Sequence, residues 1–244
     1  MKISHKLMVF VVCGFVALAG PVVGGEFKTN PIAVVELFTS QGCSSCPPAD
    51  EFLAEIQKRP NVLALAYHVD YWDYIGWEDT LGSGAHSDLQ RAYAQSWGKN
   101  RIYTPQMVIN GVADYVGSDR ENIDAEIARA TLPIFVDLTY HGGLLEARIN
   151  PVQNAQGGVV YLVTFKNEVV VDIERGENRG KSITYAQVVT SRRAVGVLAP
   201  EKGAHIQLPM SELLDEQSDG VVVMVQQQID GLPGPILGAS LYQM

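Results

Sequence analysis

Two cysteines, Cys43 and Cys46, stand between an apolar run and a helix-forming segment, and no other feature limits the fold of this chain as strongly. Residues 33–38 (AVVELF) form a short apolar run of the kind found in strands buried on both faces of a parallel sheet. A helix is expected next, because the Pro-Pro pair after the second cysteine suits a first helical turn. A second apolar run, residues 62–69 (VLALAYHV), predicts another buried strand. The sequence therefore predicts a parallel strand–helix–strand unit with both cysteines at the N-terminus of its helix.

Residues 70–132 extend this unit, and the texture of the sequence changes after Pro133. The first part predicts an aromatic insertion, a helix over residues 88–97, a β-hairpin that turns at Gly111 and a closing helix over residues 121–130. The second part predicts one weak helix over residues 210–216 and seven short strands, over residues 134–140, 144–149, 159–165, 169–173, 183–189, 221–227 and 236–241. We therefore expect an α/β domain over residues 26–132 and a β-rich, sandwich-like domain over residues 133–244.

The first 25 residues have the pattern of a secretory signal peptide. Two lysines near the start precede an apolar stretch, residues 7–18, and small residues follow it. The stretch is too short for a membrane helix and ends at a Gly-Pro pair, which disfavours the alternative of an uncleaved membrane anchor. Cleavage removes Cys13 and leaves Cys43 and Cys46 as the two cysteines of the mature chain. The sequence predicts a periplasmic or secreted protein without stable membrane insertion after cleavage.

The charge of the chain argues against nucleic-acid binding. The formal net charge is −9, and loss of the signal leaves 16 basic against 27 acidic residues, a net charge of −11. A phosphate backbone requires a clustered basic surface, and no stripe of Lys or Arg is present. With 47% hydrophobic and 18% charged residues, the chain is also neither disordered nor collagenous.

The two cysteines form the strongest chemical motif of the sequence. A helix N-terminus stabilises a thiolate, and two intervening residues allow the second sulfur to bond to the first. This geometry predicts that Cys43 is an attacking nucleophile and Cys46 a resolving thiol. The alternative is a static disulfide, but a bond that closes so short a loop removes little chain entropy.

Thr104 and Pro105 form a second motif. A Thr-Pro pair directly before a strand in a fold of this type is where a cis-proline loop faces the cysteines, and its backbone can pair with an extended substrate peptide. We therefore expect Pro105 in the catalytic site and Thr104 among the substrate-binding residues.

Glu36 is a third candidate, because a carboxylate within AVVELF is expected to be buried in a central strand. Burial raises the pKa of a carboxyl group and makes it a proton carrier for the resolving thiol. An edge position with solvent access, or a salt bridge inside the sheet, is an equally weighted alternative.

His68 and Asp70 end the second predicted strand, at the same sheet edge as the cysteines. Two thiolates and the His68 imidazole suit a soft metal such as Cu(I) or Zn(II), although a histidine that closes a buried strand is more often a hydrogen-bonded structural residue. Aromatic residues follow at once, and among them Tyr71 and Trp72 are candidates for contact with an apolar segment of a substrate.

The order of Glu36, Cys43-x-x-Cys46 and Thr104-Pro105 resembles the thioredoxin superfamily over about residues 32–131. The segments ELFTSQGCSSCPPAD, LAYHVDYWDYIGW, YTPQMVING and RGENRG further resemble a family of secreted bacterial proteins of unknown function with a thioredoxin-like domain. The resemblance implies a thioredoxin-like fold followed by a β-rich domain. It also implies that Cys43 is the nucleophile, Cys46 the resolving thiol, Pro105 a cis-proline and Glu36 the counterpart of a buried acid.

Two departures from the thioredoxin pattern are present. Ser44 and Ser45 stand where thioredoxins carry Gly-Pro, and Glu36 lies seven rather than six residues before Cys43.

Together these features predict an exported thiol–disulfide oxidoreductase that acts on cysteine-bearing exported proteins without an organic cofactor. The alternative from another class is a copper-binding or metallochaperone protein that uses Cys43, Cys46 and His68. A non-catalytic interaction protein with a vestigial disulfide is a third possibility. The RGENRG segment, residues 175–180, is read as a turn between strands with no chemistry assigned to it.

Overall fold

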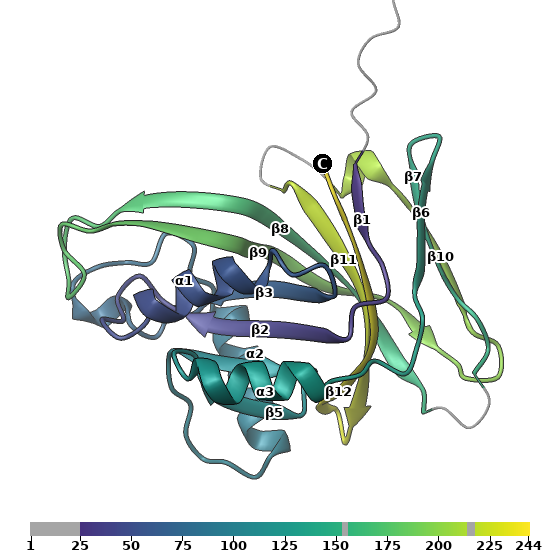
Figure 1. The fold of residues 1–244 in the computed structure, drawn as a ribbon, viewed down its shortest axis with the longest axis horizontal. Helices are drawn as coiled ribbons and strands as arrows, with labels where there is room; N and C mark the ends of the chain where they lie inside the picture. Colours follow the sequence, from purple (N-terminus) through teal and green to yellow (C-terminus); the bar gives the residue numbers. More distant parts are fainter. Residues whose placement is uncertain (1–24, 153–155, 214–217) are drawn as a thin grey trace, which may run out of the picture.

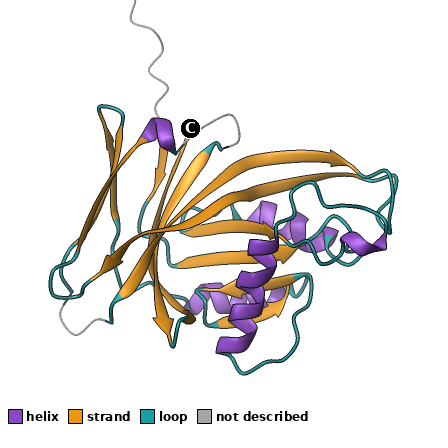
Figure 2. Ribbon diagram, turned by 180° about the vertical axis from the view of Figure 1, so that it is seen from behind, coloured by secondary structure: helices purple, strands orange, loops and turns teal. Residues whose placement is uncertain are grey.

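The computed structural model describes residues 25–152, 156–213 and 218–244, which form a mixed α/β fold (Figure 1). Within these residues, three α-helices accompany a nine-stranded mixed sheet and a separate three-stranded sheet. The three α-helices gather on one side of the molecule, and the three-stranded sheet lies at the other (Figure 2). None of the helices in the described ranges is long and apolar enough to cross a membrane. The predicted signal peptide and Cys13 fall outside the described residues.

The strand–helix–strand unit predicted around the cysteines is confirmed. Strand β2 (Ala33–Thr39) leads to α1 (Pro47–Ile56) and then to β3 (Val62–His68), which pairs with β2 in parallel. Both strands are buried along their whole length, as their uninterrupted apolar sequences require. Helix α1 starts with two prolines after Cys46, where missing N–H groups cost nothing.

The predicted helix, hairpin and closing helix follow, although the first of these helices begins at Gly84 rather than at residue 88. The elements after β3 are η1 (Asp73–Ile75), α2 (Gly84–Ser96), β4 (Gln106–Ile109), β5 (Ala113–Val116) and α3 (Arg120–Arg129). Strand β4 runs antiparallel to β2, and β5 antiparallel to β4, so that this part of the sheet has the order β3-β2-β4-β5.

In the described part of the chain, seven strands follow Pro133, of which four continue the same sheet and three form the separate sheet. They are β6 (Asp137–His141), β7 (Leu144–Ile149), β8 (Gly158–Asp172), β9 (Ser182–Leu198), β10 (Ala204–Pro209), β11 (Gly220–Ile229) and β12 (Leu232–Gln243). The large sheet has the order β1-β12-β11-β8-β9-β3-β2-β4-β5, where β1 is Glu26–Lys28. Strand β9 meets β3 at the pair Ala66 and Val188, so the sheet crosses the boundary expected near residue 132.

A second layer covers part of this sheet. Strands β6, β7 and β10 form the three-stranded sheet, and their apolar side chains pack on those of β8, β11 and β12 in one buried cluster. Alternating burial along β7, where Leu145, Ala147 and Ile149 point inward, shows one face in the core and one in solvent.

Three details of the fold differ from the sequence-based expectation. The two strands expected at residues 159–165 and 169–173 form one strand, β8. Its pairing with β11 stops at Phe165, but its polar middle continues to pair with β9. Strands β1 and β10 were not expected. Of the weak helix at residues 210–216, η2 (Met210–Glu212) is a short 3₁₀ turn, and residues 214–217 lie outside the described residues.

Strand β2 separates two chemically different environments near the cysteines. Ala33, Val35 and Leu37 pack against α1 and α3, whereas Val34 and Phe38 face the core that contains Tyr93 of α2. Because side chains alternate along a strand, Glu36 shares the second face and Thr39 the first. This alternation decides which polar groups lie below α1.

Candidate functional site

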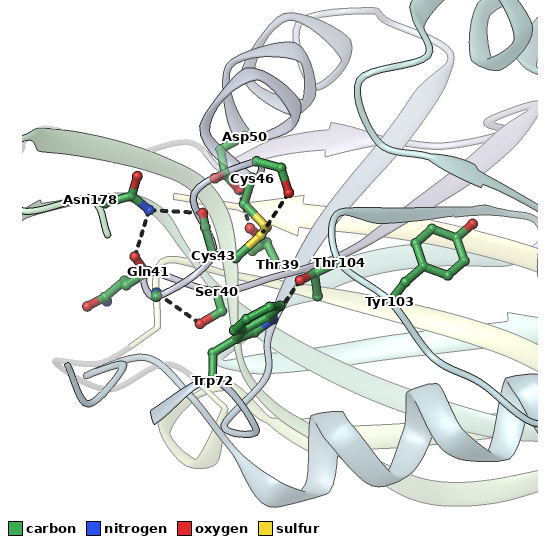
Figure 3. Close-up of a disulfide and its surroundings, with 12 residues drawn as sticks. Thr39, Ser40, Gln41, Cys43, Cys46, Asp50, Trp72, Tyr103, Thr104 and Asn178 are labelled. Atoms are coloured by element: carbon green, nitrogen blue, oxygen red, sulfur yellow. Dashed lines mark hydrogen bonds between the residues drawn. A yellow bond between two sulfur atoms is a disulfide. The ribbon is translucent and has the colours of Figure 1, made fainter. Parts of the chain in front are cut away.

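Cys43 and Cys46 form a disulfide at the N-terminus of α1 (Figure 3). Their exposed fractions are 1% and 0%, although the two serines between them are exposed. The Cys46 amide donates to the Cys43 carbonyl at 3.2 Å and not to sulfur. The Ser45 hydroxyl lies 3.4 Å from Cys43 Sγ, within hydrogen-bonding range of a sulfur. Ser45 is therefore the polar side chain placed to bind a thiolate at Cys43.

The Thr104–Pro105 loop lies beside the disulfide, as the sequence predicted, and its peptide bond is cis. The Trp72 indole N–H donates to Thr104 Oγ1 at 2.7 Å, which joins the aromatic insertion to this loop (Figure 3). Tyr71 is linked less directly: its hydroxyl donates to Gln90, whose amide donates to the Tyr103 carbonyl. Burial raises the pKa of Tyr71. Of the predicted substrate-binding residues, Trp72 and Thr104 therefore meet at the disulfide.

We expect Trp72→Phe to increase the rate at which dithiothreitol reduces the disulfide by about fivefold. The reagent must reach a buried bond. Loss of the Trp72–Thr104 hydrogen bond, worth about 1 kcal/mol, favours by this factor the local opening in which Trp72 and Thr104 separate beside the disulfide. The rate is measured by quenching the reaction with an alkylating reagent and determining the masses of the products by mass spectrometry. Thr104→Val removes the same hydrogen bond and should act equally, whereas Trp97→Phe in the C-cap of α2 should leave the rate unchanged. Equal rates in all four proteins would contradict this assignment.

Glu36 is buried, but the structure does not bring it to the cysteines. It lies on the face of β2 opposite α1, where Tyr93 donates to Glu36 Oε2 at 2.6 Å and Gln226 donates to the Tyr93 hydroxyl at 2.7 Å. Burial raises the pKa of Glu36, and the nearby Arg192 guanidinium opposes this shift. Neither alternative weighed from the sequence is seen: Glu36 lies in a buried inner strand, and it forms no salt bridge within the part of the chain that the structure describes.

Asp50 is a buried acid near Cys46 that sequence reasoning did not assign to the site. It follows Cys46 by one helical turn, its backbone N–H donates to the Cys46 carbonyl at 3.1 Å, and its side chain faces the sheet. Thr39 donates to Asp50 Oδ1 at 2.8 Å, and Oδ2 has no partner among the described residues. Burial raises the pKa of Asp50 to about 7, against the opposing effect of His68. The spacing of Cys46, Asp50 and Leu53 on one helix face was the available signal.

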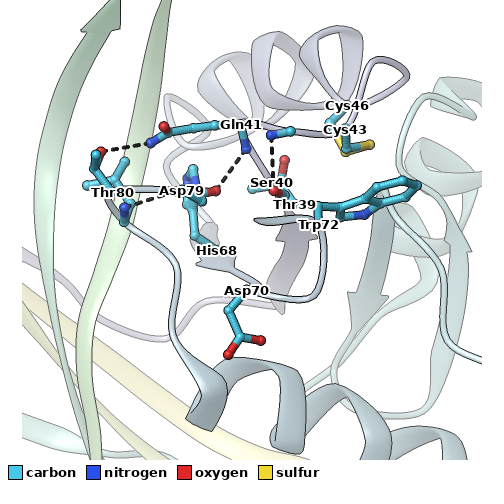
Figure 4. Close-up of polar contacts among 12 residues, drawn as sticks. Thr39, Ser40, Gln41, Cys43, Cys46, His68, Asp70, Trp72, Asp79 and Thr80 are labelled. Carbon is cyan, nitrogen blue, oxygen red and sulfur yellow. Dashed lines mark hydrogen bonds and ion pairs between the residues drawn. A yellow bond between two sulfur atoms is a disulfide. The ribbon is translucent and has the colours of Figure 1, made fainter. Parts of the chain in front are cut away.

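His68 is buried and bound to a carboxylate (Figure 4). Its Nδ1 lies 2.9 Å from Asp79 Oδ2, which also accepts the Gln41 backbone N–H at 2.8 Å. Burial acts to raise the pKa of Asp79, but His68 and the backbone donors together hold it below its ordinary value. Asp70 points instead to α2 and accepts from the Ser87 hydroxyl.

The copper alternative requires both cysteines as thiolates, whereas here the two sulfurs are bonded to each other. Asp79 binds Nδ1 of His68, and the other ring nitrogen, Nε2, is buried without a partner among the described residues. In the described ranges, no three side chains among His, Cys, Asp and Glu are grouped so that they could hold a metal ion. The structural reading of His68, as a hydrogen-bonded residue at the end of a buried strand, agrees with its contacts.

Asn178, from the RGENRG segment, also belongs to the site. Its side-chain amide donates to the carbonyls of Gln41 and Cys43, each at 2.9 Å (Figure 3). The residue is fully buried, although an Asn in a Gly-rich turn is ordinarily exposed. No local pattern in the sequence connects residue 178 with residue 43.

Fold and site together define a mixed α/β protein with a CxxC disulfide at a helix N-terminus, next to a cis-proline loop. The chain belongs to the DUF1223 family, described as a protein of unknown function, whose model matches residues 34–226. This agrees with the second resemblance seen in the sequence. None of the curated proteins compared with the chain matches it.

A solved structure has the same overall architecture. It is the crystal structure of an Agrobacterium tumefaciens protein from a structural genomics consortium, with 33% sequence identity and a TM-score of 0.79. The similarity covers 88% of this chain and 95% of that chain. It extends the likeness beyond the strand–helix–strand unit to most of both proteins.

Proposed function

We propose that this protein is an exported thiol–disulfide oxidoreductase whose first half is thioredoxin-like. The observation that carries the proposal is the Cys43–Cys46 disulfide at the N-terminus of α1, next to the Thr104–Pro105 loop. The strand order β3-β2-β4-β5, with β2 and β3 parallel and β4 and β5 antiparallel to their neighbours, supports the fold assignment. Helix α1 packs on this sheet, and Cys46 directly precedes its first residue.

In the oxidising direction, a substrate thiolate attacks Cys43 Sγ, the Cys43–Cys46 bond breaks and Cys46 leaves as a thiolate. A second substrate thiolate then displaces Cys43 from the mixed disulfide. The substrate loses two electrons and two protons and gains a disulfide, while the protein gains two thiols. The reverse sequence reduces a substrate disulfide, with Cys43 as the attacking thiolate.

Two side chains are suited to assist these steps. Ser45 can donate a hydrogen bond to a thiolate at Cys43, from its position 3.4 Å from the sulfur. Asp50 can exchange a proton with Cys46, because its carboxyl lies one turn away on the same helix face and its pKa is raised to about 7 by burial. Asp50 therefore takes the role that the sequence gave to Glu36.

The substrates we propose are exported proteins with cysteines. Residues 1–25 have the pattern of an export signal, and the reaction needs no organic cofactor because electrons pass between sulfurs. Tyr74 has an exposed fraction of 81% and stacks on Trp72, with 6.4 Å between ring centroids. This aromatic pair offers a surface for an apolar side chain of the substrate next to the disulfide.

The test is the capture of a mixed disulfide. A Cys46→Ser variant, mixed with an oxidised test protein that contains an accessible disulfide, should form a covalent complex through Cys43, because the resolving thiol is absent. Cys43→Ser should form far less of this complex, and the variant with both substitutions none. The complex is detected as a band that disappears on reduction. If Cys46→Ser forms no complex and the native pair does not equilibrate with glutathione, the disulfide is structural and the proposal fails.

A further inference from the structure

The β8–β9 hairpin reaches across the molecule to the disulfide. Its two strands extend beyond β3, and the connecting loop, residues 173–181, lies at the edge of the sheet where α1 begins (Figure 1). Asn178, in this loop, contacts residues 41–46, which we call the disulfide loop, through its two hydrogen bonds to the carbonyls of Gln41 and Cys43. A residue from the second half of the chain thereby completes the site.

The loop holds the Asn178 amide in one orientation. Lys181 Nζ donates to Asn178 Oδ1 at 2.8 Å, which leaves Nδ2 directed at the two carbonyls. Backbone hydrogen bonds from Ile173 to Lys181, at 2.9 Å, and from Gly180 to Ile173, at 2.7 Å, close the base of the loop. Gly176 and Gly180 have φ values of +75° and +80°, which explains both glycines of RGENRG. RGENRG is therefore an ordered loop that holds Asn178 against the disulfide loop, rather than a simple turn between strands.

The disulfide loop is also held from its other side. The side-chain oxygen of Gln41 accepts one hydrogen bond from the Trp77 indole N–H, at 2.8 Å. The backbone N–H of Gln41 donates to the Asp79 carboxylate. Asn178 supplies the contact that reaches Cys43 itself. The Cys43 carbonyl accepts from both Asn178 and the Cys46 amide, which fixes the peptide plane between Cys43 and Ser44.

We propose that Asn178 is a positioning residue for the Cys43–Cys46 pair and that its two hydrogen bonds stabilise the disulfide form over the dithiol form. This inference deepens the proposed function and rests on it. Reduction replaces a covalent S–S bond by two thiols that must separate to van der Waals contact. Because both side chains are buried and have little room to rotate, we expect part of this separation to move the backbone of Cys43. Hydrogen bonds that hold this backbone in the bonded arrangement are weakened by the shift, and their loss opposes reduction.

The experiment compares reduction equilibria. The protein disulfide and two glutathione thiols give the protein dithiol and glutathione disulfide, and the constant of this exchange is measured for the full mature chain. Asn178→Ala should raise the constant about tenfold, because two hydrogen bonds that favour the disulfide are lost. By the relation for a two-electron couple, this equals a potential about 30 mV less negative. Asn178→Asp, which lacks the donor but keeps the shape, should shift the constant in the same direction.

Two matched measurements separate positioning from general support. Glu177→Ala alters an exposed neighbour in the same loop and should leave the constant unchanged. Urea unfolding of Asn178→Ala should show a larger loss of stability for the oxidised protein than for protein kept reduced with a phosphine. Equal losses in both states, with an unchanged exchange constant, would overturn the proposal. The unfolding comparison does not require exchange with thiols, so it decides the role of Asn178 even if the proposed function fails.

Discussion

Replacing Asp50 with asparagine should stabilise the protein at alkaline pH, with an advantage over the wild type that grows by about 4 kcal/mol between pH 4 and pH 8. Burial raises the pKa of Asp50 from 3.8 to about 7 in the folded protein, so folding favours the protonated carboxyl. The stability that the protonated group contributes is present below about pH 4 and is lost as the pH rises through 7. Asparagine does not titrate and avoids this loss, and its oxygen can still accept from Thr39. The shift of about three pKa units corresponds to the stated free energy at 1.36 kcal/mol per unit.

The measurement is urea unfolding of wild type and variant at several pH values, with the difference between the two proteins plotted against pH. Other groups titrate in both proteins and cancel in this difference. Glu51→Gln removes an exposed acid whose charge is the weakest of those that act on Asp50, and its difference from the wild type should change far less with pH. An equally small change for Asp50→Asn would show that the carboxyl is not stabilised in its protonated form by burial. The charges that act on Asp50 are those of His68, Asp79 and Glu51, and all remain in the variant.

Replacing Arg192 with methionine should lower the free energy of unfolding at pH 8 by about 3 kcal/mol, the cost of leaving a buried charge without its partner. The Arg192 guanidinium donates to Gln226 and lies 3.8 Å from the centroid of the Tyr161 ring. It also opposes the rise in the pKa of Glu36, whose exposed fraction is 0%. Methionine keeps much of the apolar stem but leaves Glu36 without a positive charge nearby.

A double-mutant cycle checks the cause. Adding Glu36→Gln to Arg192→Met should recover most of the loss, because no uncompensated buried charge remains. Arg193→Met alters the next residue, which is exposed, and should change stability by less than about 0.5 kcal/mol. Losses that simply add in the double variant would contradict a coupling between Glu36 and Arg192. Such a result would assign the effect of Arg192 to its packing on Tyr161.

The strand–helix–strand unit and the hairpin were predictable from the sequence because their signals are local. Two apolar runs, the paired prolines at the start of α1 and the turn at Gly111 each determine the structure of their own segment. The Thr104–Pro105 loop was predictable from its order along the chain. These elements lie between residues 33 and 130, and most pair with neighbours in sequence.

The remainder depends on contacts between distant segments, which a single sequence does not display. Asn178 meets Cys43 across 135 residues, and only the long β8–β9 hairpin brings the two together. Glu36 and Asp50 are both buried acids, and their positions relative to the disulfide follow from which face of β2 each one occupies. Strand alternation predicts that face only when the element packed against it is known.

The pairing of β1 with β12 places the two ends of the described chain in one ladder, with Glu26 opposite Gln243 and Lys28 opposite Leu241. Synthesis makes β1 before all the strands that lie between it and β12, so the partner of β1 does not exist until those strands have been made. The β1 edge of the sheet therefore cannot close before β12 has been synthesised. Closure of this edge is a late step of folding, and β1 stays unpaired in the emerging chain until then.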